Sequence, residues 1–190
     1  MKKLSGGLIA LIVILGAVLL IGSMVLGSYN QLVTAREAVS SGQAVIDTQL
    51  QRRADLIPNL VSTVKGFAAQ EQSVIDSVTE ARAQLTGAQT MADKADADAA
   101  LSGALSRLLV VVENYPELKS DATFISLMDE LSGTENRIAV ARNDYNEIVR
   151  SYNNKIITFP GNIMAGMFGL EKAEYFAASQ GAQDVPQVTF

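Results

Sequence analysis

Few side chains in this sequence could carry chemistry, because its 190 residues include no histidine and no cysteine. Histidine is the commonest general base and metal ligand in proteins, and cysteine supplies thiolate ligands. Three aspartates, Asp93, Asp96 and Asp98, lie close together and could bind Ca²⁺ through their oxygens. An EF-hand loop also needs a glycine at its sixth position and a glutamate at its twelfth, and neither falls in register here. We therefore predict a solvated loop rather than a metal site.

The remaining catalytic candidate is Ser62 with Lys65, which lie about one helical turn apart. A lysine that activates a serine must be desolvated beside an oxyanion hole, and the surrounding residues provide neither. A di-iron site inside a helical bundle would need Glu-x-x-His pairs, which this sequence lacks. The sequence thus predicts no catalytic residue, no metal site, no cofactor and no enzyme.

Charged residues near the apolar faces of the expected helices favour a structural role. Glu135 and Arg142 fall near the inward stripe of a helix over residues 122–158, and Arg36 falls near that of a helix starting at Tyr29. We predict a partly buried ion pair among Arg36, Glu135 and Arg142 that sets the register of the helices. A carboxylate site is the chemical alternative.

The dipeptide Tyr-Asn occurs three times and places asparagines at Asn30, Asn146 and Asn153. Tyr145 and Tyr152 belong to a seven-residue apolar repeat, so the asparagines that follow them lie beside the helix seam. Asparagine can hydrogen-bond across a helix interface and select its partner. We predict polar contacts between helices at these three asparagines, either within one chain or between protomers.

The elements that would position these residues are helices, because apolar residues recur at spacings of three and four. The four apolar stripes cover residues 29–50, 57–85, 101–112 and 124–156. We expect a loop near 87–96, a break at Pro116, and Asp121 as the cap of the last long helix. The fold class predicted is all-α, an N-terminal transmembrane helix that continues into an antiparallel four-helix bundle over residues 29–158. The last residues, VPQVTF (185–190), are the one candidate strand.

The segment RRADLIP (52–58) is where we expect the first helix of the bundle to end. Arg52 and Arg53 suit the last turn of a helix, where positive charge meets free carbonyls. Asp55 suits the start of the next helix, and Pro58 is tolerated in a first turn. We predict a helix corner at these four residues, with a kink inside one continuous helix as the alternative.

Residues 4–28 carry no charge, and their densest apolar part, residues 8–26, is 19 residues long. At about 1.5 Å per residue this run approaches the roughly 30 Å hydrocarbon thickness of a bilayer. The run is longer than a usual signal-peptide core, and no Ala-x-Ala cleavage site follows it. We predict that residues 1–28 are a retained membrane anchor that contacts the bilayer through residues 4–28.

The distribution of charge indicates an orientation. Lys2 and Lys3 precede the apolar run, and Arg36 is the first basic residue after it. The positive-inside rule then places the helical domain on the outer, non-cytoplasmic side. Apart from these two lysines the chain has 13 basic and 20 acidic residues, which excludes general attraction to nucleic acid.

Residues 159–190 form a tail that begins with an uncharged stretch, TFPGNIMAGMFGL (158–170). In an up-and-down bundle this stretch returns to the membrane surface. We predict either a cap over the open end of the bundle or a second, interfacial membrane contact, although the stretch lacks the basic face typical of such helices. The residues that would make the membrane contact are Phe159, Ile163, Met164, Met167 and Phe168.

Four stretches resemble the LemA family. They are YNQLVTAREAV (29–39), IDTQLQRRADLIPNLVSTVKGF (46–67), YPEL (115–118) and TENRIAVARNDYNEIVRSYNNKIITFP (134–160). The resemblance extends over essentially the whole chain. One departure is AAQE (68–71), where many members carry a histidine before the glutamate.

The resemblance implies a bacterial cell-membrane protein with one span, a helical bundle and no active site. One branch of the family resembles proteins of magnetosome membrane formation, and other members are thought to work beside membrane-bound metalloproteases. We therefore expect a scaffold, adaptor or membrane-organising protein that forms a homo-oligomer or binds such a metalloprotease or another membrane protein. Four valines are left over beyond the apolar positions of the four stripes and favour association: Val39, Val74, Val110 and Val111. The alternative is a sensory or small-ligand-binding bundle that signals through its membrane helix.

Overall fold

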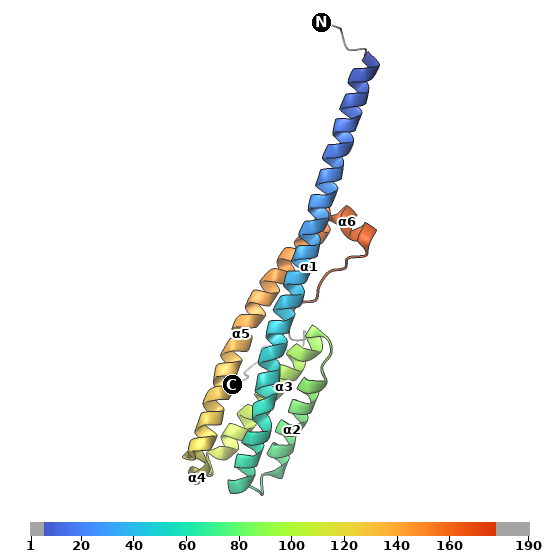
Figure 1. The fold of residues 1–190 in the computed structure, drawn as a ribbon. Coiled ribbons are helices and arrows are strands. Elements are labelled where there is room, and N and C mark those ends of the chain that lie inside the picture. The colour runs from blue at the N-terminus through green and yellow to red at the C-terminus, as the bar shows by residue number, and fades with distance from the viewer. Residues whose placement is uncertain (1–5, 178–190) are drawn as a thin grey trace, which may run out of the picture. The chain divides into compact units, whose positions relative to one another are not determined.

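The computed structural model describes residues 6–177, and every regular element in that range is an α-helix (Figure 1). The all-helical prediction is confirmed for these residues, whereas the candidate strand at 185–190 and the first five residues lie outside them. The helices are α1 (Gly6–Phe67), α2 (Gln72–Gly87), α3 (Met91–Val112), α4 (Pro116–Lys119), α5 (Ala122–Ile157) and α6 (Gly161–Phe168).

The described residues divide into two compact units. Unit 1 contains residues 6–40 and 148–173, and unit 2 contains residues 41–147 and 174–177. The two longest helices, α1 and α5, contribute to both units. The shorter helices α2, α3 and α4 belong to unit 2, and α6 belongs to unit 1.

Helix α1 continues without a break through the segment in which we predicted a corner. Pro58 lies inside the helix, so the predicted corner at Arg52, Arg53, Asp55 and Pro58 is wrong. The apolar stripe explains the continuity, because Ile57 on one side of the proline and Leu60 on the other are both fully buried. Their burial offsets the backbone hydrogen bond that the proline removes.

The chain reverses at residues 68–71 instead. The Ala68 N–H donates to the Val64 carbonyl at 2.8 Å, and the Glu71 N–H donates to the Ala68 carbonyl at 3.1 Å. Ala68 is buried, and the Tyr115 hydroxyl donates to the Glu71 carboxylate at 2.9 Å. The turn therefore depends on tertiary contacts of its ends, and its alanines carry no turn signal in the sequence.

The starts of the other long helices follow the capping rules. The Asp121 carboxylate accepts a hydrogen bond from the Phe124 N–H at 2.8 Å, which confirms Asp121 as the cap of α5. Thr90 and Asp93 form a reciprocal capping box at the start of α3, with hydrogen bonds of 3.0 and 3.2 Å. The predicted loop near 87–96 is therefore shorter, because residues 91–96 are helical.

The predicted seven-residue seam of α5 is buried throughout. Its four members are Leu131, Ile138, Tyr145 and Tyr152. Helix α2 likewise buries the apolar positions spaced by three and four, Ile75, Val78, Ala81 and Leu85. Residues spaced by three and four lie on one side of a helix, so each stripe forms the surface that packs against the neighbouring helices.

Candidate functional site

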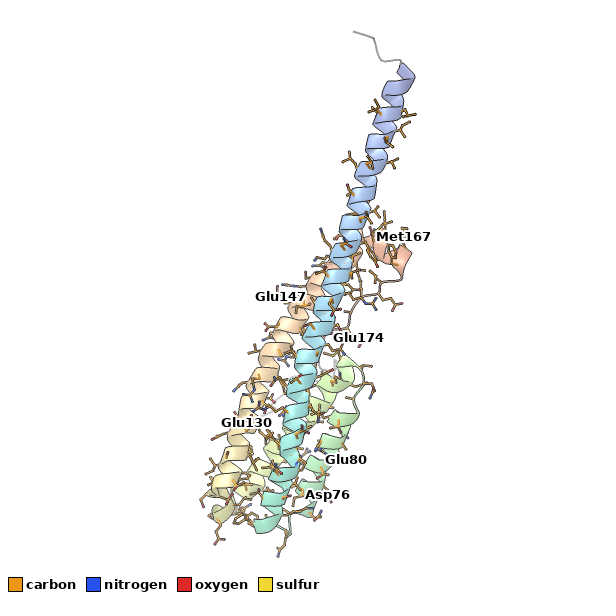
Figure 2. All side chains as sticks on the ribbon, in the orientation of Figure 1. Asp76, Glu80, Glu130, Glu147, Met167 and Glu174 are labelled. Atoms are coloured by element: carbon orange, nitrogen blue, oxygen red, sulfur yellow. The ribbon has the colours of Figure 1, made fainter. Side chains whose placement is uncertain are left out.

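The first candidate surface is the apolar part of α1 in unit 1. Its large apolar side chains between residues 11 and 26 project on all sides of the helix and are mostly more than half exposed (Figure 2). This helix is the one candidate membrane span within residues 6–177, and none of its most apolar 18-residue stretch is buried. A helix that is apolar all round, with no protein partner to cover it, is suited to a lipid environment.

Helix α6 packs against α1 in the same unit, just beyond this apolar stretch. The rings of Tyr29 and Phe168 have centroids 4.5 Å apart and are tilted by 47°. At the other end of α6, a Cβ atom on Gly161 would lie 3.9 Å from the Leu32 side chain and only 2.1 Å from the Lys155 carbonyl oxygen. Glycine at position 161 thus permits a close approach of α6 to the end of α5.

The two faces of α6 differ in exposure. Met164 and Ala165 are buried against the protein, so the predicted membrane contact at Met164 is wrong. The physical reason is that residue 164 lies on the face that packs inward, about 100° around the helix from the exposed Ile163. The other four predicted contact residues are exposed: Phe159, Ile163, Met167 and Phe168.

Unit 2 contains a buried cluster of charges around Arg53. Its guanidinium Nη1 donates to the Asp98 carboxylate and also lies 2.5 Å from an Oε atom of Glu135. Its Nη2 donates to the Ser102 hydroxyl at 3.0 Å. The cluster thus joins α1, α3 and α5 through one side chain that is 3% exposed.

The predicted ion pair contained the correct acid but the wrong bases. Glu135 pairs with Arg53, whereas Arg36 and Arg142 are exposed. Arg36 precedes Arg53 by 17 residues, about 25 Å along a helix, so both cannot lie beside the same carboxylate. Sequence reasoning had assigned Arg53 to a helix end and therefore missed its burial.

Two carboxylates share the Arg53 guanidinium, and the positive charge of Arg142 also acts on Asp98. Burial raises the pKa of the Asp98 carboxyl above its ordinary value of 3.8, Arg53 opposes this rise, and the neighbouring Glu135 carboxylate adds to it. Within the described residues, the Nε of Arg53 is a buried side-chain nitrogen without a hydrogen-bond partner. The cluster therefore connects three helices through a buried cation, and its role in setting their register stays a prediction.

Pro58 has a direct consequence next to this cluster. In a regular helix the Ala54 carbonyl would accept the N–H of residue 58, which a proline lacks. The Nε of Arg82, on α2, donates to that carbonyl at 2.8 Å. The proline thus opens an acceptor on α1, and Arg82 uses it to connect α1 with α2.

The predicted contacts between helices at Asn146 and Asn153 are wrong, because both residues bind an extended segment after α6. In unit 1 Asn153 accepts the Ala173 N–H at 2.8 Å and donates to the Ala173 carbonyl at 3.0 Å. In unit 2 Asn146 bonds Phe176 in the same way, at 2.9 and 3.0 Å. The third asparagine, Asn30, is exposed.

The tyrosines of the same dipeptides add one bond each. The Tyr145 hydroxyl donates to the Glu174 carbonyl at 2.8 Å, and the Tyr152 hydroxyl donates to the Glu171 carbonyl at 3.1 Å. Burial raises the pKa of both hydroxyls, so both remain donors at neutral pH. We call each Tyr-Asn pair with its bound segment a clamp. The repeated Tyr-Asn dipeptide in the sequence indicated these contacts. The side chains bond the backbone of the segment after α6 rather than another helix.

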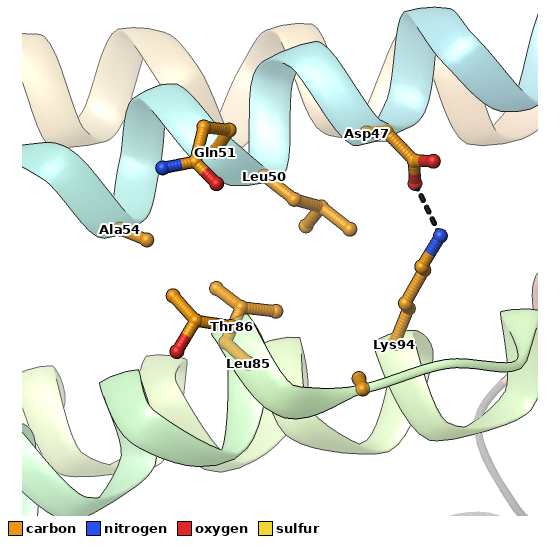
Figure 3. Close-up of a pocket in the computed structure, with 8 residues that line it drawn as sticks. Asp47, Leu50, Gln51, Ala54, Leu85, Thr86 and Lys94 are labelled. Atoms are coloured by element: carbon orange, nitrogen blue, oxygen red, sulfur yellow. Dashed lines mark hydrogen bonds and ion pairs between the residues drawn. The ribbon is translucent and has the colours of Figure 1, made fainter.

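A pocket of about 230 Å³ lies between α1 and the α2–α3 region of unit 2 (Figure 3). The Lys94 ammonium bonds the Asp47 carboxylate at its edge, at 2.6 Å. Ligand sites are usually about 300–1,000 Å³, and here the charged groups satisfy each other. This pocket is therefore smaller than a usual ligand site.

The aspartates considered for Ca²⁺ have other partners. Asp93 caps α3 and Asp98 bonds Arg53, and Asp96 also interacts within the protein. In the part of the chain that is described, no group of three acidic side chains is placed to hold a metal ion.

Comparison with known proteins places this architecture in a family. The model of the LemA family matches residues 42–190. This chain belongs to the LemA family. Among relatives, magnetosome protein MamQ 2 of Paramagnetospirillum magneticum is 32% identical over 187 residues, which covers 85% of this chain and 68% of that protein. Magnetosome protein MamQ of Magnetospirillum gryphiswaldense is 30% identical with the same coverage, and protein LemA of Metamycoplasma hominis is 24% identical over 81% of this chain and 71% of its own length.

The resemblance identified from the sequence is thereby confirmed. LemA family membership and the unburied apolar helix together suggest membrane association. The names of these relatives state no enzymatic activity.

Proposed function

We propose that this LemA family protein is a single-pass membrane protein whose helical domain acts as a scaffold or adaptor. Residues 1–28 anchor the chain in a bacterial membrane, and the helices that follow form an antiparallel four-helix bundle on the non-cytoplasmic side. The bundle associates with further copies or with other membrane proteins, a membrane-bound metalloprotease among them. The observation that carries the proposal is the apolar stretch of α1, which nothing in its own unit covers.

The energetics support the anchor. Leaving the large apolar side chains of this stretch in water would forgo about 1.5–3 kcal/mol each relative to burial. The rest of unit 1, which includes the end of α5 and α6, leaves the most apolar 18-residue stretch of α1 unburied. A bilayer covers the stretch over its whole circumference, which a single neighbouring helix cannot do.

The scaffold role is supported by apolar side chains that unit 2 leaves exposed. A shallow groove of about 350 Å³ between α1 and α5 contains Val45 and Val140, both more than half exposed. Val110 on α3 is 70% exposed, whereas Val39, which also seemed available for association, is buried. Exposed apolar side chains flanked by polar ones are typical of protein contact surfaces.

The anchor is tested by membrane extraction of the full-length protein. We expect the wild type to stay in the membrane pellet after an alkaline wash, because a spanning helix is held by hydrophobic burial. The double variant Leu15→Lys, Leu19→Lys should be lost from the pellet, since each lysine costs roughly 2.5–3.5 kcal/mol near the middle of a span. The matched control Leu15→Ile, Leu19→Ile should behave as wild type. Release of the wild type by the wash would refute the anchor.

The scaffold role is tested by the mass of the particle extracted in mild detergent, measured by light scattering. We expect an assembly of several copies or a complex with another membrane protein, and Val140→Arg should reduce its mass. Gln84→Arg is the matched control, since it adds the same charge at an exposed position on α2 outside the groove. A strict monomer without partners would contradict the scaffold role.

A further inference from the structure

Helix α6 lies at a defined level along α1. The apolar run of α1 ends at Leu26, and α6 contacts the helix at Tyr29, three residues later. Three helical residues advance about 4.5 Å, and the headgroup layer on each side of a roughly 30 Å hydrocarbon core is about 5–8 Å thick. If α1 spans the membrane, the Phe168 end of α6, beside Tyr29, lies within this headgroup layer. The Gly161 end, beside Leu32 six residues after Leu26, lies about 9 Å from the hydrocarbon core, at the outer edge of the layer.

The outer face of α6 is unusually apolar for a surface in water. Ile163 and Met167 on this face are 49% and 68% exposed, and Phe159, just before the helix, is 72% exposed. Phe168, whose ring contacts Tyr29, still leaves 51% of its surface exposed. Residues 156–170 contain no charged side chain, whereas Lys155 and Glu171 border the stretch. The charges thus stop where the apolar surface begins and start again where it ends.

The inner face holds α6 in this position. Met164 and Ala165 are buried, and Gly169 ends the helix in the left-handed conformation at φ 63°. The buried face of α6 therefore packs against the protein. Its exposed apolar side chains are available to a partner outside the chain. These side chains adjoin the lipid-facing surface of α1, which makes lipid the partner that can cover both.

We infer that α6, together with Phe159, is a second membrane attachment that lies in the headgroup layer and sets the depth of α1. The inference rests on the proposed function, because it takes α1 as the span. Tyr29 fits such a position, since tyrosine is enriched at the membrane interface. The attachment works by apolar burial, because α6 has no basic residue to attract anionic lipids.

The absence of cysteine makes the test direct, because one introduced cysteine can carry a nitroxide label without background. The full-length protein is reconstituted into vesicles of phosphatidylcholine and phosphatidylglycerol in equal amounts. Three variants are compared: Met167→Cys on α6, Val18→Cys in the predicted span, and Glu80→Cys on α2 as a water-exposed control. Electron paramagnetic resonance then measures how accessible each label is to oxygen, which partitions into lipid, and to a water-soluble nickel chelate.

We expect the oxygen-to-nickel accessibility ratio at position 167 to be several-fold higher than at position 80 and lower than at position 18. A ratio at 167 equal to that at 80, with position 18 in lipid, would overturn the inference and leave the anchor intact. A water-like ratio at 18 would overturn the anchor and the inference together. Dipolar broadening between labels at 167, with protection from both reagents, would show that a second copy rather than lipid covers α6 and would also overturn the inference.

Discussion

At the level of single residues, the two carboxylates of Asp98 and Glu135 share the guanidinium of Arg53. Removing a buried ion pair as a whole is often tolerated, whereas removing one partner leaves a buried charge without compensation. The neighbouring Arg52 offers a contrast, because its side chain is 58% exposed and pairs with Glu130 at the surface. Adjacent arginines in one helix thus have different roles.

The first prediction compares these two arginines. Arg53→Met should lower the free energy of unfolding by about 3–5 kcal/mol, because Asp98 then remains buried without a cation. Arg52→Ala should lower it by about 1 kcal/mol or less, as expected for an exposed pair. Urea denaturation of the full-length protein in mild detergent, followed by circular dichroism, measures both. Equal losses of unfolding free energy for the two variants would show that the buried cluster around Arg53 contributes no more than the exposed pair of Arg52.

The raised pKa of Asp98 predicts how stability depends on pH. A carboxyl that binds its proton more tightly in the folded chain stabilises the fold when protonated. Its contribution is therefore fully present below about pH 3.8, the ordinary pKa, and is lost as the pH rises through the raised pKa of the folded state. As the pH rises through this interval, we expect the unfolding free energy of the wild type to fall relative to that of Asp98→Asn. Above the interval the difference should stay constant. A difference that is independent of pH would show that Asp98 titrates normally.

At the level of elements, the contact between α1 and α2 depends on a missing donor. Arg82→Met should destabilise the protein by about 1–3 kcal/mol, because the Ala54 carbonyl then loses its only cross-helix donor among the described bonds. In a Pro58→Ala background the alanine N–H can bond that carbonyl, so Arg82→Met should cost less. A double-mutant cycle on unfolding free energies measures this coupling. Additive effects would refute the compensation.

The close packing of α6 against the end of α5 depends on Gly161. Gly161→Ala should destabilise unit 1 by about 1–3 kcal/mol, because its Cβ would lie 2.1 Å from the Lys155 carbonyl oxygen and force the backbone to move. Gly166→Ala is the matched control in the same helix, since its Cβ would meet nothing within 4 Å. That control should stabilise by about 0.5–1 kcal/mol. Hydrogen exchange of the α6 amides distinguishes the two, and equal protection in both variants would contradict the close approach.

The clamps predict which amides are protected after α6. Asn153→Ala should speed hydrogen exchange of the Ala173 amide about tenfold, because it removes both bonds to that residue. The adjacent exposed Asn154→Ala should leave this amide unchanged. Exchange read residue by residue with NMR or fragment mass spectrometry provides the measurement. Unchanged protection of Ala173 in Asn153→Ala would show that the clamp does not hold the segment.

At the level of the whole molecule, composition and architecture agree on how the chain meets a membrane. The net charge is −5, so the protein as a whole is repelled by anionic lipid heads rather than attracted to them. In the proposed function, attachment therefore comes from apolar surface, along the uncharged stretch of α1 and on α6 beside it. The polar clusters of unit 2 determine how its helices pack together, and its exposed valines remain available for partners.

The sequence by itself determined the helical content, the uncharged apolar stretch and the family. Helix content follows from spacings of three and four and from capping residues such as Asp121, which are local properties of the chain. The seam of α5 was predictable for the same reason, since a repeat of seven keeps one side of a helix buried whatever it faces.

Only the tertiary structure decided the pairings. Whether Arg53 or Arg36 meets Glu135, and whether Asn153 binds a helix or an extended segment, depends on which faces lie together, and no local pattern contains that information. Helix α1 continues past Pro58 because the burial of Ile57 and Leu60 outweighs one missing backbone hydrogen bond. The turn at 68–71 could not be predicted from its own residues, which are not typical turn formers. A contact from Tyr115, far along the chain, holds it in place.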